Sequence, residues 1–267
     1  MALSPPYVAV ADGRTITENV VRALAVVAGA FLFAGVFSAL GAALLGVNVD
    51  NGLDASSTPA ALYAAVNAIS FVGFILSGVA YLRLRDDRSL VHLRRPRPSD
   101  LGWAVVGLVG ILLGSLVMGA VVDVLSALAE TLFGVTVESG QNSIITQGRE
   151  NPVLFLYMVP VALFFVGPAE ELVFRGVVQG LLRRAFGVVP GVAFASLLFG
   201  LGHYLAISSG SAWTYILTAG ALGLVLGAVY EYTESIAVPA LAHGLWNAGL
   251  FVVNYYVATT ALTMPGG

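Results

Sequence analysis

Seven long runs of apolar residues, separated by short polar stretches, dominate the pattern along this chain. The runs cover residues 20–47, 60–82, 101–128, 153–184, 188–206, 212–230 and 236–260. A helix needs about 20 apolar residues to cross the hydrocarbon core of a bilayer. The run at 153–184 is too long for one simple crossing, and we expect an interruption at Gly167 and Pro168. The pattern therefore predicts an all-α fold, a polytopic transmembrane helical bundle of seven to eight spans.

Composition points to the same class of protein. Of the 267 residues, 58% are hydrophobic and only 10% are charged, whereas a soluble globular chain carries roughly 25% charged residues. Lipid must therefore face much of the surface, and we expect a multi-pass protein of the cell membrane. The net charge of −3 is small and points to no nucleic-acid partner. The chain has no Cys, which excludes disulfides, thiolate metal ligands and a Cys nucleophile.

Arginines in the connecting segments predict the orientation, because cytoplasmic loops carry an excess of basic residues. The segment 83–100 contains six Arg residues, so we expect it to be cytoplasmic. The segment 48–59 contains no Arg, and the segment 129–152 contains one Arg beside three Glu residues, so both should lie outside. Arg183 and Arg184 then return the chain to the cytoplasm. The amino terminus is accordingly predicted to be cytoplasmic.

Three clusters of polar residues stand out inside the apolar runs, although a charged group near the bilayer centre costs at least about 2.5–3.5 kcal/mol. They are Glu170, Glu171, Arg175, His203, His243 and Asn247. With a helical rise of about 1.5 Å per residue, all of them lie roughly 12 to 20 Å from the same predicted cytoplasmic face. Three helices can therefore present these groups to one cavity at a common depth.

Helical spacing places several polar groups on one face. Glu171, Arg175, Gln179 and Arg183 recur every four residues, so they form a polar stripe toward the cytoplasmic end. Such a stripe can line a hydrated path from the cytoplasm. The alternative is an intrahelical ion pair that only makes the segment insertable, with the histidines acting as hydrogen-bonding links between helices.

Three short motifs in the second half of the chain resemble those of a known family. Glu170-Glu171-Leu-Val-Phe-Arg175 resembles EExxxR, Phe199-Gly-Leu-Gly-His203 resembles FxxxH, and His243-Gly-Leu-Trp-Asn247 resembles HxxxN. These are motifs of the CAAX-protease and bacteriocin-processing (CPBP, or Abi) family of intramembrane endopeptidases, which includes the Ras-converting CaaX prenyl proteases. We therefore divide the chain into amino-terminal transmembrane helices and loops at 1–152 and a CaaX-protease-like catalytic core at 153–260.

The resemblance implies peptide hydrolysis by a water molecule that a glutamate activates. Glu170 would act as the general base, and His203 would help to position and polarise the water. His243 and Asn247 would donate hydrogen bonds to the tetrahedral oxyanion. Glu171 and Arg175 would support these groups. Glu170 and Glu171 can also exchange roles. The expected partners are a membrane-associated peptide or protein substrate and the lipid bilayer.

Other chemistry stays open at this level. Two His and a Glu can hold a divalent metal such as Zn²⁺ with one position open for water, although nothing in the sequence requires a metal. A proton-coupled transporter also uses intramembrane Glu, His and Arg, but no inverted repeat is visible in the two halves. A non-catalytic membrane scaffold or immunity protein on the same fold is the third alternative.

Overall fold

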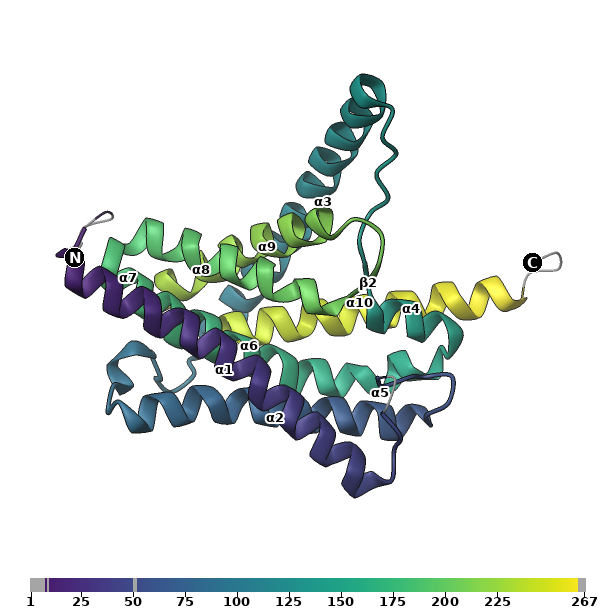
Figure 1. The fold of residues 1–267 in the computed structure, drawn as a ribbon, viewed down its shortest axis with the longest axis horizontal. Helices are drawn as coiled ribbons and strands as arrows, with labels where there is room; N and C mark the ends of the chain where they lie inside the picture. Colours follow the sequence, from purple (N-terminus) through teal and green to yellow (C-terminus); the bar gives the residue numbers. More distant parts are fainter. Residues whose placement is uncertain (1–7, 9, 50–51, 264–267) are drawn as a thin grey trace.

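The chain folds almost entirely into helices (Figure 1). The structure is a computed structural model that describes residue 8 and residues 10–49 and 52–263. Its α-helices are α1 (Gly13–Leu45), α2 (Ala60–Leu84), α3 (Pro98–Phe133), α4 (Ser143–Glu150), α5 (Val153–Val161), α6 (Gly167–Glu171), α7 (Gly180–Phe186), α8 (Val188–Gly202), α9 (Ala212–Thr233) and α10 (Ala237–Thr263). Two π-helical segments, η2 (Ala162–Val166) and η3 (Leu172–Gln179), join α5, α6 and α7. The remaining elements are the 3₁₀ turns η1 (Arg88–Leu90) and η4 (His203–Ala206) and the strands β1 (Gln141–Asn142) and β2 (Ile207–Ser209).

Within the described residues, six helical segments are long and apolar enough to cross a membrane. They are α1, α2, α3, the continuous segment Val153–Phe186, the segment Val188–Ala206 and α9. The seventh apolar run forms α10, which is 27 residues long, but His243, Asn247 and Asn254 interrupt its apolar sequence. The predicted helical membrane bundle is confirmed, whereas the predicted count of seven to eight spans is not.

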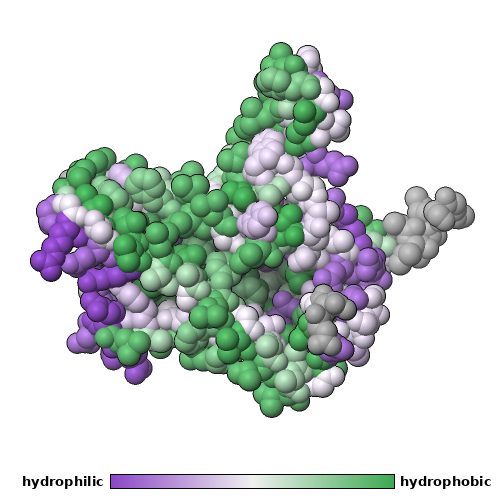
Figure 2. Space-filling model, viewed as in Figure 1, coloured by the Kyte–Doolittle hydropathy of each residue, from purple (hydrophilic) through white to green (hydrophobic). Residues whose placement is uncertain are grey.

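The surface of the bundle has the polarity of a membrane protein. Figure 2 shows apolar residues over most of one face, with polar residues gathered at its two ends. Large side chains such as Leu32, Leu116 and Phe164 are between 62% and 69% exposed. A water-soluble protein rarely leaves so wide an apolar surface uncovered. The exposed apolar residues therefore form the lipid-facing belt between two polar ends.

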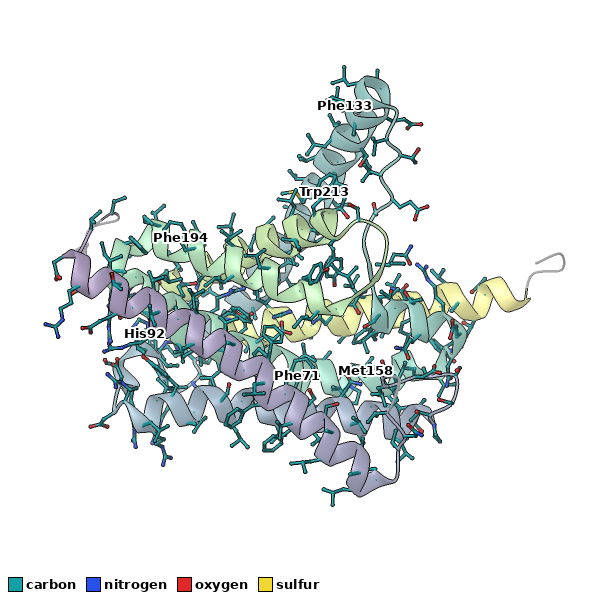
Figure 3. All side chains as sticks on the ribbon, in the orientation of Figure 1. Phe71, His92, Phe133, Met158, Phe194 and Trp213 are labelled. Atoms are coloured by element: carbon teal, nitrogen blue, oxygen red, sulfur yellow. The ribbon has the colours of Figure 1, made fainter. Side chains whose placement is uncertain are left out.

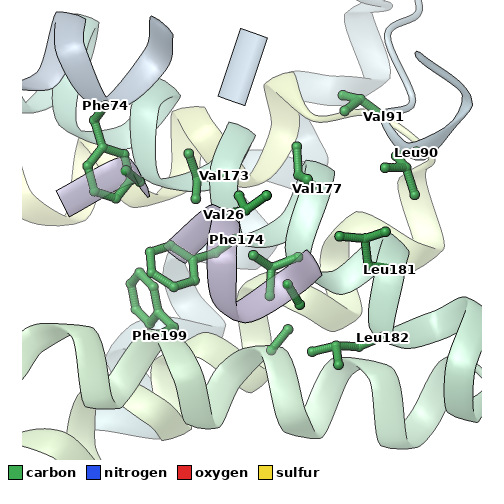
Figure 4. Close-up of a cluster of buried hydrophobic side chains, with 14 of the residues drawn as sticks. Val26, Phe74, Leu90, Val91, Val173, Phe174, Val177, Leu181, Leu182 and Phe199 are labelled. Carbon is green, nitrogen blue, oxygen red and sulfur yellow. The ribbon is translucent and has the colours of Figure 1, made fainter. Parts of the chain in front are cut away.

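The interior is held together mainly by the carboxyl-terminal core and the first two helices. In Figure 4, Phe74 of α2, Phe174 and Val177 of η3 and Phe199 of α8 form one buried cluster. The Phe174 and Phe199 rings meet edge to face with centroids 5.1 Å apart, a geometry that adds to the free energy gained from burial. Since side chains from both parts share this cluster, the two parts pack as neighbours. The division at residue 152 stays a prediction.

The sequence suggested an interruption at Gly167 and Pro168, but the helical segment Val153–Phe186 continues through these residues. It continues as η2, α6 and η3, changing between π- and α-helical turns. Pro168 has no backbone N–H to donate, and a π-helical turn beside it accommodates the lost hydrogen bond without ending the helix. Such π-segments are frequent at functional sites, and here they flank the two glutamates.

Helices α6 and α10 approach each other closely at Gly167. A Cβ atom at this position would lie 2.5 Å from the Ala240 carbonyl oxygen and 2.9 Å from the Gly244 backbone nitrogen. Small residues allow membrane helices to pack this closely. The contact lies one turn before Glu170 and beside His243, so it sets the spacing between the helices that carry these side chains.

We expect Gly167→Ala to destabilise the protein by about 1–3 kcal/mol, because overpacking a close helix contact costs this much. Gly249→Ala, also in α10, is the matched control because no atom lies within 4 Å of the added Cβ. Thermal unfolding of the purified proteins in detergent measures the difference. Equal unfolding midpoints for the two variants would show that the contact does not set the helix spacing.

Candidate active site

A buried ion pair and a histidine form the innermost part of the site. Glu171 and Arg175 are both 0% exposed, and the Arg175 Nε lies 3.1 Å from Glu171 Oε2. The other carboxylate oxygen of Glu171 lies 2.9 Å from Nδ1 of His243, on α10. The guanidinium of Arg175 stacks over the Phe199 ring, 4.5 Å from its centroid. Glu171 thus contacts the guanidinium of Arg175 with one carboxylate oxygen and the ring of His243 with the other.

The adjacent Glu170 occupies a different environment from Glu171. Its side chain is 16% exposed, and its Oε2 lies 3.8 Å from Nε2 of His243. It lines a cavity of about 460 Å³, whereas Glu171 does not. Because successive helical residues point in directions about 100° apart, one carboxylate faces the cavity and its neighbour faces the protein interior. The two glutamates are therefore not equivalent.

His203 and Asn247 line the same cavity as Glu170. His203 begins η4 at the end of α8, and its Nδ1 lies 2.8 Å from the Phe199 carbonyl oxygen. A carbonyl only accepts hydrogen bonds, so Nδ1 carries the proton and Nε2 of the neutral ring keeps a free lone pair. The structure thus brings Glu170, His203 and Asn247 from three helices to one cavity, whereas Glu171, Arg175 and His243, which the depth argument placed with them, do not line it.

The protonation of His243 follows from its partner. Nδ1 faces the Glu171 carboxylate, which accepts a hydrogen bond, so Nδ1 is the donor. Nε2 can donate at the same time only when the ring is an imidazolium. The negative charge of the Glu171 carboxylate would balance the positive charge of that form. His203 and Asn247 also line a second cavity of about 150 Å³, together with His243, which does not line the first. His203 and Asn247 therefore lie between the two cavities, and His243 faces only the smaller one.

Two residues that the sequence analysis did not select contribute to the site. Phe199 packs edge to face against both histidines, with ring centroids 4.5 Å from His203 and 5.8 Å from His243. Tyr215 of α9 lines both cavities, and its hydroxyl oxygen accepts a hydrogen bond from Asn142 Nδ2. The position of Phe199 four residues before His203 was a usable signal. Nothing local in the sequence distinguishes Tyr215 from the other tyrosines.

The sequence left a divalent metal site open as an alternative. In the part of the chain that the structure describes, no group of three or more His, Asp or Glu side chains is arranged to hold an ion. Nδ1 of His203 and Nδ1 of His243 are bonded to the Phe199 carbonyl and the Glu171 carboxylate, so only Nε2 of each ring is available as a ligand. A catalytic zinc site requires three protein ligands around one point. The described side chains do not converge on one point in this way.

The polar stripe does not line a hydrated path. Glu171, Arg175 and Gln179 are all 0% exposed. Gln179 Nε2 donates to Glu231 Oε1 at 2.9 Å, and Arg183 pairs with the other oxygen of Glu231 at 2.8 Å. Glu231 lies on α9, outside the motifs. The stripe is a buried chain of polar contacts that fastens α7 and η3 to α9, and only its last member reaches the surface.

The fold and the site together define a class of protein: a helical membrane protein with a carboxylate, two histidines and an amide beside an interior cavity. Comparison with known proteins narrows the class. Residues 152–249 match the family described as Type II CAAX prenyl endopeptidase Rce1-like. The resemblance drawn from the three motifs is thereby confirmed: residues 152–249 of this chain are similar to this family of CAAX prenyl endopeptidases.

Two bacterial relatives extend the comparison. The chain is 26% identical over 209 residues to the membrane-embedded CAAX protease MroQ of Staphylococcus aureus (strain USA300), covering 73% of this chain and 75% of that protein. It is 30% identical over 111 residues to the uncharacterized protein YpbD of Bacillus subtilis (strain 168), covering 42% of this chain and 50% of that protein. No solved structure matches the chain.

Proposed function

We propose that this protein is an intramembrane endopeptidase that hydrolyses peptide bonds of membrane-associated substrates with a water molecule activated by Glu170. The observation that carries the proposal is the shared cavity of about 460 Å³ lined by Glu170, His203 and Asn247. It gives a carboxylate, an imidazole and an amide access to the same small volume. The similarity of residues 152–249 to CAAX prenyl endopeptidases supports peptide hydrolysis, and no feature of the site among the described residues favours the transporter or scaffold alternatives.

Glu170 is the better candidate for the general base. A base needs contact with water and substrate, and Glu170 faces the cavity while Glu171 is fully buried against Arg175. The Glu170 carboxylate accepts a proton from water as the hydroxide oxygen attacks the peptide carbonyl carbon. The free Nε2 of His203 accepts the hydrogen bond from the second water proton and so fixes the direction of attack.

The remaining polar groups serve the tetrahedral intermediate. Asn247 donates an N–H to the oxyanion, and the imidazolium form of His243 donates from Nε2, because Nδ1 is already bonded to Glu171. Preorganised donors of this kind stabilise developing negative charge most strongly where water is excluded. When the C–N bond breaks, the proton held by Glu170 moves to the leaving nitrogen, which gives a carboxylic acid and an amine.

The test is cleavage of a membrane-tethered peptide library by the purified protein in lipid nanodiscs. We expect wild type and Glu138→Gln to cleave at the same rate, because Glu138 is an exposed loop residue, and Glu170→Gln to be inactive. Elemental analysis of the same samples records any bound metal. Cleavage by Glu170→Gln at the wild-type rate would overturn the assignment of the base.

A further inference from the structure

The large cavity lies toward one end of the bundle. Besides Glu170, its walls include Leu53 from the connection before α2, Ile145 and Gln147 from α4, and Ala206 from η4. These residues belong to three different connections between long helices. In Figure 3, Met158, which also lines the cavity, lies on the side where Figure 1 shows α4 and the carboxyl-terminal end of α10. His92, in the connection between α2 and α3, lies at the opposite end.

That opposite end is closed by the connection between α2 and α3. Leu90 and Val91 are 4% and 6% exposed. Their side chains cover Gly180 and Gly176, where an added Cβ would lie 3.0 Å from each. The peptide groups of His92 are bonded on both sides, since its N–H donates to the Tyr230 hydroxyl and its carbonyl accepts from the backbone N–H of Ile236, just before α10. These contacts pack the segment tightly against η3, α7 and α9.

Charged contacts fasten the same connection to the bundle. Arg94 bonds both carboxylate oxygens of Asp100 and also the Thr233 carbonyl. Arg184 bonds both oxygens of Asp87, and this hydrogen bonding lowers the pKa of the Asp87 carboxyl below its ordinary value. Asp87 therefore stays ionised at neutral pH and keeps the contact. The closed end is thus tied to α3, α7 and α9 by ion pairs and carbonyl contacts.

The distribution of arginine relates these two ends to the two sides of the membrane. The closed connection lies within the segment 83–100, which holds six of the twelve basic residues, while the segment 48–59 has none. Because basic loops stay in the cytoplasm, the closed end is the cytoplasmic one. The cavity walls include residues from the two segments, 48–59 and 129–152, that the same rule places outside. A cavity reached from the cytoplasm, as the sequence suggested, does not fit these positions.

The walls also indicate what kind of chain the cavity accepts. Apart from Glu170, its polar lining consists of uncharged groups, such as Asn67, Ser70 and Gln147, among aromatic rings. No Arg lines it within the described residues, so no guanidinium is placed to hold a free terminal carboxylate. Amides and hydroxyls suit the peptide groups of an extended, uncharged segment.

We propose that the substrate enters from the extracytoplasmic side, as an uncharged polypeptide segment that passes α4 to reach Glu170. This deepens the proposed function and rests on it only for the identity of the substrate. The accessibility of the cavity can be measured without catalysis. A failure of the access route and a failure of the peptidase assignment are therefore separate results.

The absence of Cys makes thiol labelling of single-cysteine variants direct. Ser70→Cys places a thiol in the cavity wall, where the native hydroxyl bonds the Ala34 carbonyl. Ser196→Cys is the matched control, because Ser196 is 1% exposed, bonds a backbone carbonyl in the same way and lines neither cavity. Ser89→Cys reports on the arginine-rich connection, where Ser89 is exposed. Each variant is treated in intact cells with a charged, membrane-impermeant methanethiosulfonate.

We expect Ser70→Cys to react at least about 10-fold faster than Ser196→Cys, since thiol reactivity requires access to water and reagent, while Ser89→Cys stays unlabelled until the membrane is permeabilised. Labelling of Ser70→Cys only after permeabilisation would overturn the proposal in favour of cytoplasmic access. Labelling of Ser89→Cys in intact cells would overturn it by inverting the orientation. Reaction of Ser70→Cys with a lipophilic maleimide alone would overturn it in favour of entry from the lipid.

Discussion

Glu170→Gln and His203→Ala should each lower the rate of peptide cleavage by about 10²–10⁴-fold, the range that general-base catalysis supplies. Glu170→Gln removes the carboxylate that accepts the proton from water, and His203→Ala removes the imidazole that orients the water molecule. Both side chains line the same cavity. Cleavage of a verified membrane-tethered peptide, followed by mass spectrometry, measures the rates.

The double variant distinguishes a catalytic unit from two independent contributions. Groups that act together are strongly non-additive, because losing one already disables the chemistry. The double variant should therefore be little slower than either single variant. Asn247→Ala keeps the general base, and its cleavage rate should fall by about 10²–10³-fold, as expected for removal of one oxyanion donor. If the losses of Glu170→Gln and His203→Ala simply multiply, the two residues do not act on one water molecule.

The second large effect concerns folding, at the buried ion pair. Glu171→Gln removes the only carboxylate in contact with the fully buried Arg175 within the described residues. Leaving one charge of a buried pair without its partner costs about 3–5 kcal/mol. We expect a corresponding fall in the free energy of unfolding, measured by denaturant titration of the protein in mixed micelles.

Two further variants test the cause of this fall. Glu18→Gln is the control, because Glu18 pairs with Arg14 at the surface, where the two side chains are 43% and 88% exposed and such pairs contribute about 0–1 kcal/mol. The combined change Glu171→Met and Arg175→Met should recover stability, since well-packed apolar residues can replace a buried pair. If Glu171→Gln unfolds at the same denaturant concentration as Glu18→Gln, the pair does not stabilise the fold.

The same variants separate the effect of Glu171 on stability from its effect on the cleavage rate. Glu171 also receives the hydrogen bond from His243 Nδ1, so a stable protein lacking Glu171 should still be impaired in cleavage. His243 would then lack the carboxylate that balances its imidazolium form and fixes its ring. This predicted loss of rate without loss of stability in the double-Met variant distinguishes a positioning role from a purely structural one.

The amino-acid sequence by itself determined the class of the fold and the approximate depth of the polar groups. Hydrophobic runs longer than the bilayer thickness leave helices as the only spanning structure, because every backbone group must be bonded within its own segment. A fixed rise per residue then places Glu170, His203 and Asn247 at a common depth, and the structure brings these three to one cavity. The motifs indicated the resemblance to the family for the same reason: each is a local pattern along the chain.

The tertiary structure alone decided which glutamate faces the cavity and which side of the bundle is closed. Glu170 and Glu171 are adjacent in the chain, so their different burial depends on the π-helical turns around them and on Arg175 and His243. The burial of the polar stripe depends on Glu231, 52 residues after Gln179, and on the packing of Leu90 and Val91 over η3 and α7. These contacts join segments distant in the sequence, and no local periodicity carries information about them.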